Sequence, residues 1–523
     1  MSRLQTRSLT IIYEEARDGS SQELIPKRLF RNAVFNSGGW AINVILTFIV
    51  TPIFVQKLTP EGYGIYALLS SLIGYYSLLD LGLGQGLVKF VSEDLAKKNY
   101  PYVYRAINTT LSIQICLGLA GLSILTLFAE PILRLLKVSS IYLFDAKIGL
   151  YASAVGFCFM MVSLGLSSTL MGLQRYDITT KVNLIINTLM LIVITLILFM
   201  GGGIGQVMIV TAIFAVIKLF VLLKIVQQKL PQWRFSLHPD WSLLLKLLSF
   251  STFLFISRAA SFFGEYVVRL MVGFILGPAG VTYYVVPWKI VIAVGGLLSS
   301  AAVVLFPYAS EIGALSPGEK IQGIFMEASK IFAAIQFPLY LSLAVFSKPI
   351  LMVWMGENFA EETWFVLSVL AFTASFGSLT TVPNLFTMGL GYAKIIAYFS
   401  IFTIIFYILT IPTLTYLVGV TGTAWAMLIS SIPGLALVIY ELKNIFRINL
   451  WQYIQVVIKP HLIFLCISAV VILVFRKTSL QPDVWTLALF PLLVCFYFGL
   501  MVLAGQIPLN KFFKIFQITN LLG

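Results

Sequence analysis

The sequence predicts an all-α polytopic membrane protein of about 14 transmembrane helices, with two parallel six-helix repeats forming two lobes around a central cavity and two further C-terminal helices. Three observations predict it. Of the 523 residues, 59% are hydrophobic and 11% are charged, against roughly 25% charged in soluble domains. Apolar stretches of span length recur along the chain, and short motifs recur at one offset. This composition excludes a soluble enzyme, a nucleic-acid-binding protein and a disordered chain.

Fourteen stretches are long and apolar enough to cross a hydrocarbon core of about 30 Å. We interpret them as helices, because a membrane barrel would show alternating segments of about ten residues. The predicted spans are 32–55, 63–86, 106–129, 147–170, 178–200, 205–226, 248–275, 281–306, 329–347, 363–386, 395–417, 421–440, 458–475 and 485–504.

The positions of Lys and Arg predict the orientation of these spans. With a cytoplasmic N-terminus, 24 of the 35 Lys and Arg residues fall in cytoplasmic segments, seven in outer segments and four within spans. This bias predicts that both termini are cytoplasmic. The outer loops are short, so we expect the functional residues to lie inside the helix bundle.

The chain contains an internal repeat, because three motifs recur at nearly one offset. They are LxPxGxxxY at Leu58 and Leu276, FxxPIL at Phe128 and Phe346, and MGL at Met171 and Met388. The offset in residue number is 218 for the first two motifs and 217 for the third. A unit of six spans is even, so both copies have the same orientation in the membrane. A duplicated bundle without a cavity is the alternative to two lobes around a substrate path.

The repeat predicts how the chain is divided. The predicted parts are a polar cytoplasmic N-terminal segment 1–31, a first lobe 32–226, a cytoplasmic linker 227–247, a second lobe 248–440, and spans 13 and 14 with a cytoplasmic C-terminus in 441–523.

Span 7 carries three ionisable residues, Arg258, Glu265 and Arg269, and span 8 carries Lys289. Ionisable side chains inside a span are costly and are functional candidates by default. In an uninterrupted α-helix the three span-7 residues lie within about 40° of one another. Two interpretations stay open. One is a cationic cavity wall that binds phosphate or an acidic sugar, and the other is a structural ion pair in which Glu265 neutralises Arg269 or Lys289.

The first repeat offers polar candidates. The offset places Trp40 opposite Arg258, and Asn36 and Asn43 are seven residues apart and therefore share a helix face. A polar face with an aromatic side chain suits a cavity that binds sugar, and interhelical hydrogen bonds are the alternative. Asp80, near the cytoplasmic end of span 2, is a candidate for binding a coupling proton or Na⁺, for capping a helix, or for pairing with a nearby cation.

The sequence does not indicate an enzyme. Neither histidine lies deep in a span, no large outer loop is present, and no Walker A motif occurs. The cysteines form no CxxC pair, so neither a metal site nor a cofactor is predicted. A multidrug antiporter for cationic drugs needs carboxylates in its cavity. The ionisable residues within the predicted spans are instead mostly Lys and Arg.

Four segments resemble the polysaccharide and O-antigen flippases of the multidrug/oligosaccharidyl-lipid/polysaccharide exporter superfamily. The resemblance covers roughly residues 27–475. The segments are LTPEGYGIY from Leu58 to Tyr66, LDLGLG from Leu79 to Gly84, MGLQR from Met171 to Arg175, and PIL from Pro349 followed by WMGENF from Trp354.

The resemblance implies a function. Members are thought to flip undecaprenyl-diphosphate-linked oligosaccharides from the cytoplasmic to the outer face of the bacterial inner membrane, by alternating access. The intramembrane cations would then bind the diphosphate or acidic sugars. The expected partners are this lipid-linked saccharide, membrane lipids and either H⁺ or Na⁺, with no nucleic acid, and the protein is expected to act as a monomer. The alternative is an ion-coupled multidrug antiporter of the same superfamily.

Overall fold

The structure is a computed structural model that describes residues 21–75, 79–80, 82–237, 239–302, 305–315 and 318–461, together with residues 494, 495, 497, 499 and 501. All regular secondary structure in these ranges is helical. The side chains of residues 21–40 and of some later residues, most of them between 249 and 261, are outside the description. Most of predicted spans 13 and 14 also lies outside it.

The first half of the described chain folds into seven α-helices. They are α2 (Ser21–Gly74), α4 (Leu83–Ala96), α5 (Tyr100–Leu127), α6 (Ala129–Leu135), α7 (Ser140–Gly172), α8 (Tyr176–Phe199) and α9 (Ile204–Lys229).

The second half repeats this order with more interruptions. Its elements are α10 (Trp241–Phe262), the π-helical turn η1 (Phe263–Val267), α11 (Val268–Ala302), α12 (Leu305–Leu315), α13 (Gly318–Val345), α14 (Ser347–Met355), α15 (Glu357–Ser378), α16 (Thr381–Gly389), α17 (Ala393–Val418), α18 (Val420–Ile429) and α19 (Ile432–Asn444), followed by α20 (Leu450–Tyr453) and η2 (Ile454–Ile458).

The helix ends recur at the offset found in the sequence. Helices α5 and α13 have the same offset of 218 at both their first and their last residues, and the first residues of α6 and α14 share it. For the first residues of α8 and α17 the offset is 217. The single long helix α7 corresponds to the pair α15 and α16, and α9 corresponds to α18 and α19. Pro383 and Pro433 lie in the first turn of α16 and α19, where a proline is tolerated at a new helix start.

Ten stretches of the described chain are long and apolar enough to span a membrane. Two of them, Ala41–Gly74 and Phe263–Gly296, each include parts of two predicted spans. The ten stretches therefore account for the first twelve predicted spans. Large apolar side chains remain exposed along α8 and α17, as expected of helices that face lipid.

The predicted breaks after spans 1 and 7 are confirmed, because α2 and α11 each consist of two helices joined by a turn within the predicted break. The turns are at Thr59, with φ 65° and ψ 165°, and at Gly277, with φ 78° and ψ −178°. These two positions are equivalent in the repeat. Glycine adopts a positive φ readily, whereas Thr59 does so against steric strain. The Thr59 hydroxyl is hydrogen-bonded to the Tyr142 hydroxyl at 2.9 Å, which helps to hold the turn.

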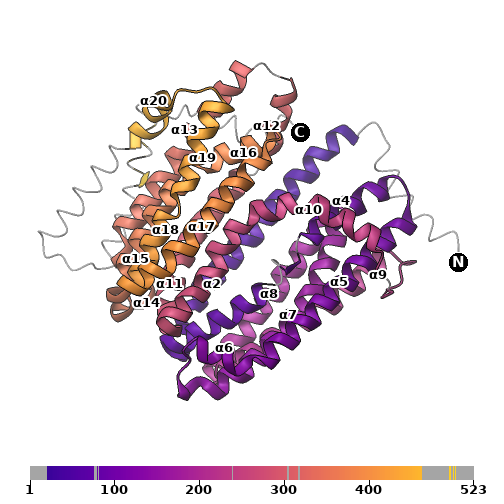
Figure 1. Ribbon diagram of the computed structural model, residues 1–523, viewed down its shortest axis with the longest axis vertical. Helices are drawn as coiled ribbons and strands as arrows, with labels where there is room; N and C mark the ends of the chain where they lie inside the picture. Colours follow the sequence, from indigo (N-terminus) through magenta and orange to yellow (C-terminus); the bar gives the residue numbers. More distant parts are fainter. Residues whose placement is uncertain are drawn as a thin grey trace, which may run out of the picture.

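Predicted span 2 is also interrupted. Helix α2 ends at Gly74 and α4 begins at Leu83, after Gly82 with φ 79°. Figure 1 shows the helices α5–α9 gathered on one side of the molecule and α13–α19 on the other, with α2 and α10 between them. The predicted boundaries of the two lobes and the central cavity stay predictions.

Candidate substrate site between the two halves

The two halves meet where the turns of α2 and α11 pack against each other. The Thr282 hydroxyl donates to the Pro60 carbonyl at 2.5 Å, and the Lys137 ammonium donates to the Ile275 carbonyl at 2.7 Å. Gly64 lies so close to the α11 backbone that a side chain would not fit there. The two halves are therefore in direct contact at the end of the bundle that the charge bias predicts to be the outer one.

A second contact between the halves lies deeper along α2. The Trp354 indole of α14 stacks on Phe48 of α2, with ring centroids 4.7 Å apart. Its Nε1 also donates to the Phe48 carbonyl at 2.8 Å. This bond satisfies the polar atom of an otherwise apolar contact and fixes α14 against α2.

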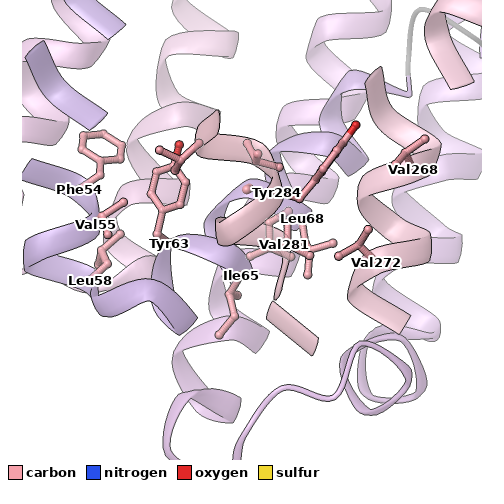
Figure 2. Packing of buried hydrophobic residues seen from close by; sticks show 14 of the residues in the cluster. Phe54, Val55, Leu58, Tyr63, Ile65, Leu68, Val268, Val272, Val281 and Tyr284 are labelled. Atoms are coloured by element: carbon pink, nitrogen blue, oxygen red, sulfur yellow. The ribbon is translucent and has the colours of Figure 1, made fainter. Parts of the chain in front are cut away.

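Lys289 of α11 reaches into the first half. Its ammonium donates to the Thr51 hydroxyl at 3.3 Å and lies 5.3 Å from the centre of the Tyr63 ring. Tyr63 is 1% exposed, and Figure 2 shows it among the buried apolar side chains of the junction. A buried aromatic face stabilises a cation without neutralising it. Among the described residues no carboxylate pairs with Lys289, so its charge remains uncompensated.

Arg269 provides a second cation at the same junction. Its guanidinium lies 3.9 Å from the Glu265 carboxylate and 5.5 Å from the centre of the Tyr266 ring. The Arg269 side chain is 13% exposed and that of Glu265 is 45% exposed. Because the distance between the two groups is long for an ion pair and the Glu265 side chain is partly exposed, Glu265 neutralises Arg269 only in part. The charge of Arg269 also acts on Lys289 and Tyr63, so the two cations share one neighbourhood.

Three buried donors at this junction have no hydrogen-bond partner in the described part of the chain. They are Arg269 Nε, the Tyr284 hydroxyl and Trp288 Nε1. Buried donors are nearly always satisfied in folded proteins. Two incompletely neutralised cations beside unpartnered donors form an arrangement that can accept an anion with several oxygen atoms.

Glu265 lies within the π-helical turn η1, and this changes one prediction. The shared face of Arg258, Glu265 and Arg269 assumed an uninterrupted α-helix. The π turn inserts an extra residue and rotates the positions after it by about 100° relative to those before it. Glu265 and Arg269 remain neighbours, and the side chain of Arg258 is outside the described part of the structure.

The other predicted residues have different surroundings. Asp80 accepts hydrogen bonds from the Gly84 amide at 2.8 Å and from Gln114 Nε2 at 2.7 Å, so it caps the start of α4. Asn43 is half-buried on α2 and has at least one polar interaction. Asn36 and Trp40 belong to α2, and their side chains lie outside the described part.

Sequence reasoning missed Thr51 and Tyr63. The repeat contains the signal for Thr51, because the offset of 218 places it opposite Arg269. Tyr63 lies within the recurring motif that begins at Leu58, but a motif does not indicate which of its side chains faces the partner half. That information depends on how α2 packs against α11.

Comparisons with known proteins agree with this architecture. A solved structure of the lipid II flippase MurJ in an inward closed conformation superposes with a TM-score of 0.71 at 16% identity, covering 90% of this chain and 98% of that one. An inward-facing MATE family multidrug resistance transporter of the MOP superfamily gives a TM-score of 0.65 at 13% identity, covering 79% and 98%. At these identities the likeness shows a common fold.

Sequence comparison is more specific. A "Putative O-antigen transporter" of Shigella flexneri is 21% identical over 396 residues, covering 76% of this chain and 93% of that protein. These relatives are transporters and flippases by name, in agreement with the expectation that the chain is not an enzyme. The family model described as polysaccharide biosynthesis protein matches residues 29–313, more than half of the chain. This multi-pass membrane protein therefore belongs to the polysaccharide biosynthesis protein family.

Proposed function

We propose that this protein flips lipid-linked oligosaccharides, carried on undecaprenyl diphosphate, across the bacterial cytoplasmic membrane by alternating access between its two halves. Family membership and the O-antigen relative support a role in polysaccharide export. The observation that carries the proposal is the pair of cations, Arg269 and Lys289, at the junction of α2 and α11 with one partly exposed carboxylate beside them.

The diphosphate is the part of such a substrate that fits this site. Two like charges in a buried neighbourhood repel each other, and an anion between them removes that cost. Arg269 can bind phosphate through two donors, and Lys289 acts as a point charge. The unpartnered Trp288 Nε1 and Tyr284 hydroxyl are available for the remaining phosphate or sugar oxygens.

The same contacts suggest how the site would change between states. Lys289 comes from the second half, whereas Thr51 and Tyr63 come from the first. Separation of the halves at this end would remove both contacts from Lys289 at once. The ammonium would then be free to stay with the substrate or with water. In the proposal Arg258, Asn36, Trp40 and Asn43 line the rest of the path, and the protein acts as a monomer in contact with membrane lipids.

The test is translocation of an undecaprenyl-diphosphate saccharide in reconstituted vesicles. We expect the wild type to translocate it, and Arg269→Gln and Lys289→Met to slow it about 10- to 150-fold, because a hydrogen bond to a charged group contributes about 1.5–3 kcal/mol. Lys218→Met is the matched control, since Lys218 is a half-buried lysine of α9 in the interior of a span and away from the α2–α11 contact. Arg258→Ala tests the candidate predicted from sequence alone.

Two outcomes would contradict the proposal. If the wild type moves no lipid-linked saccharide but expels a cationic dye against a proton or Na⁺ gradient, the multidrug antiporter is the better assignment. If Lys218→Met slows translocation as much as Lys289→Met, a general loss of positive charge explains the effect and the junction is not the substrate site.

A further inference from the structure

A second buried ionisable group lies far from the junction. Glu441 of α19 is 0% exposed, and neither of its carboxylate oxygens has a hydrogen-bond partner among the described residues. An ionised carboxylate in such surroundings costs far more free energy than a neutral one. The group must therefore carry a proton or hold a bound cation.

Asp80 shows the contrast within the same molecule. It is 4% exposed, yet it accepts hydrogen bonds from the Gly84 amide and from Gln114 Nε2. Two N–H donors favour the charged form of a carboxyl group. Among the described residues no N–H group donates to Glu441, so the charged form is stabilised less at Glu441 than at Asp80. The role of binding a coupling proton, considered for Asp80 from the sequence, fits Glu441 better.

The neighbours of Glu441 are hydroxyl groups. Thr387 of α16 lies within reach of the carboxyl, and its hydroxyl is also buried and without a hydrogen-bond partner. Tyr453 of α20 is close enough to interact electrostatically with Glu441, and Ser329 of α13 lies beside the Tyr453 hydroxyl. A hydroxyl accepts the hydrogen bond that a protonated carboxyl donates, whereas it cannot neutralise a carboxylate.

No ion pair between Glu441 and a cation occurs in the described part of the chain. Charged residues of α19 and of nearby helices lie near this end of the bundle, but within the described residues none forms a salt bridge with Glu441. These residues are Lys443 of α19 itself, Glu327 and Lys330 of α13, and Lys394 of α17. A proton is the smallest ligand that removes the charge, and it requires only the single acceptor that Thr387 provides.

An aromatic cluster that includes Tyr453 lies beside the site. Phe325 and Phe446 stack with ring centroids 3.9 Å apart, and Phe386 and Tyr453 lie 5.6 Å and 6.2 Å from Phe325. These rings come from α13, the segment after α19, α16 and α20. Glu441 itself is 0% exposed, so its proton can exchange with water only when the surrounding elements move apart. The charge bias predicts that this end of α19 faces the cytoplasm.

We propose that Glu441 is a proton-binding site in the second half of the protein. In the state described here its carboxyl is neutral and directed at Thr387. When α16 or α20 moves away from α19, water enters, the O–H bond breaks, and the proton passes to that water and leaves a hydrated carboxylate. That this proton drives translocation rests on the proposed function; the existence of the proton site does not.

Infrared difference spectroscopy of the purified, lipid-reconstituted protein tests the site without any transport. We expect the carbonyl stretch of a protonated carboxyl at neutral pH, its absence in Glu441→Gln, and its retention in the control Asp80→Asn. Thr387→Val should keep the band but shift it, because the hydroxyl beside the acid is replaced by a methyl group. If Glu441→Gln does not fold, Glu441→Asp replaces it and must shift the band.

The proposal is overturned if the wild type shows no such band, or if the band persists in Glu441→Gln. It is also overturned if replacing choline chloride by sodium chloride abolishes the band, because the site then takes Na⁺ in place of the proton. In vesicles, the pH gradient should alter translocation by the wild type and not by Glu441→Gln. A wild type that translocates nothing refutes the proposed function, while the infrared result still decides the proton site.

Discussion

Replacement of Gly64 by alanine should open the end of the bundle where α2 and α11 meet. A Cβ atom at this position would lie 1.8 Å from the Pro278 carbonyl oxygen, whereas Cβ atoms essentially never approach within 3.0 Å of another heavy atom. The obstacle is backbone, so it cannot be relieved by a rotamer change. The two turns must therefore separate by about 1 Å, because an overpacked contact of this kind is relieved only by a backbone shift.

The same displacement would break the hydrogen bonds that join the halves. The Thr282 hydroxyl lies 2.5 Å from the Pro60 carbonyl, and the Lys137 ammonium lies 2.7 Å from the Ile275 carbonyl. A separation of about 1 Å takes both distances beyond the upper limit of about 3.2 Å for a good hydrogen bond. Each bond is worth about 0.5–1.5 kcal/mol. Loss of both corresponds to about 1–3 kcal/mol, a shift of about 5- to 150-fold away from the closed arrangement.

Spin labels on the exposed residues Arg134 and Glu361, one in each half, report the separation of the two halves at this end. We expect a longer distance distribution in Gly64→Ala than in the wild type. Gly62→Ala is the matched control, because its Cβ would be 3.2 Å from Leu58 and its nearest neighbours all belong to the first half. A Gly64→Ala distribution that coincides with those of the wild type and Gly62→Ala would refute the reasoning.

Three further predictions concern stability. Lys289→Met should raise the thermal unfolding midpoint while it slows translocation, because it removes a buried, uncompensated charge beside Thr51; a lowered midpoint would argue against a substrate role. Trp233→Ala should cost about 3–5 kcal/mol of unfolding free energy and expose the linker to proteolysis, since Trp233 is 1% exposed; unchanged cleavage kinetics would contradict this. Hydrogen bonds from Ser242 and the adjacent backbone hold the pKa of Asp240 below its usual range. Asp240 therefore contributes fully to the free energy of unfolding at a pH above its unfolded-state pKa. This contribution is lost as the pH falls through the lower folded-state pKa. Unfolding midpoints measured against pH should show this acid loss in the wild type and not in Asp240→Asn, and identical profiles would exclude it.

The arrangement of elements along the chain could be predicted because it depends on local properties. The length and apolarity of a segment indicate a span without knowledge of its neighbours, and the first twelve predicted spans correspond to helical stretches in the structure. The turns at Thr59 and Gly277 lie in the predicted breaks between spans 1 and 2 and between spans 7 and 8. The extent of the apolar stretches predicts each break, but packing between α2 and α11 decides how tight the turn is.

The candidate site was predicted less completely. Arg269, Glu265 and Lys289 stand out in the sequence because charges are rare inside spans, and the structure brings the first two into contact. Their neighbours Thr51 and Tyr63 are ordinary residues of a membrane helix. A hydroxyl or an aromatic ring becomes part of a site only when another helix presents a cation to it, and this depends on long-range packing.

The sequence by itself determined that the protein lies in a membrane, that it is helical and that it contains a repeat. Hydropathy, segment length and recurring motifs depend only on the order of residues. The tertiary structure alone decided which buried charges are compensated. Asp80 and Glu441 are both acidic residues near the end of a span, yet within the described residues Asp80 accepts hydrogen bonds from two N–H donors and Glu441 from none. The Gly84 amide is a local partner at the start of α4, but Gln114 lies on another helix, and its position beside Asp80 depends on how the two helices pack.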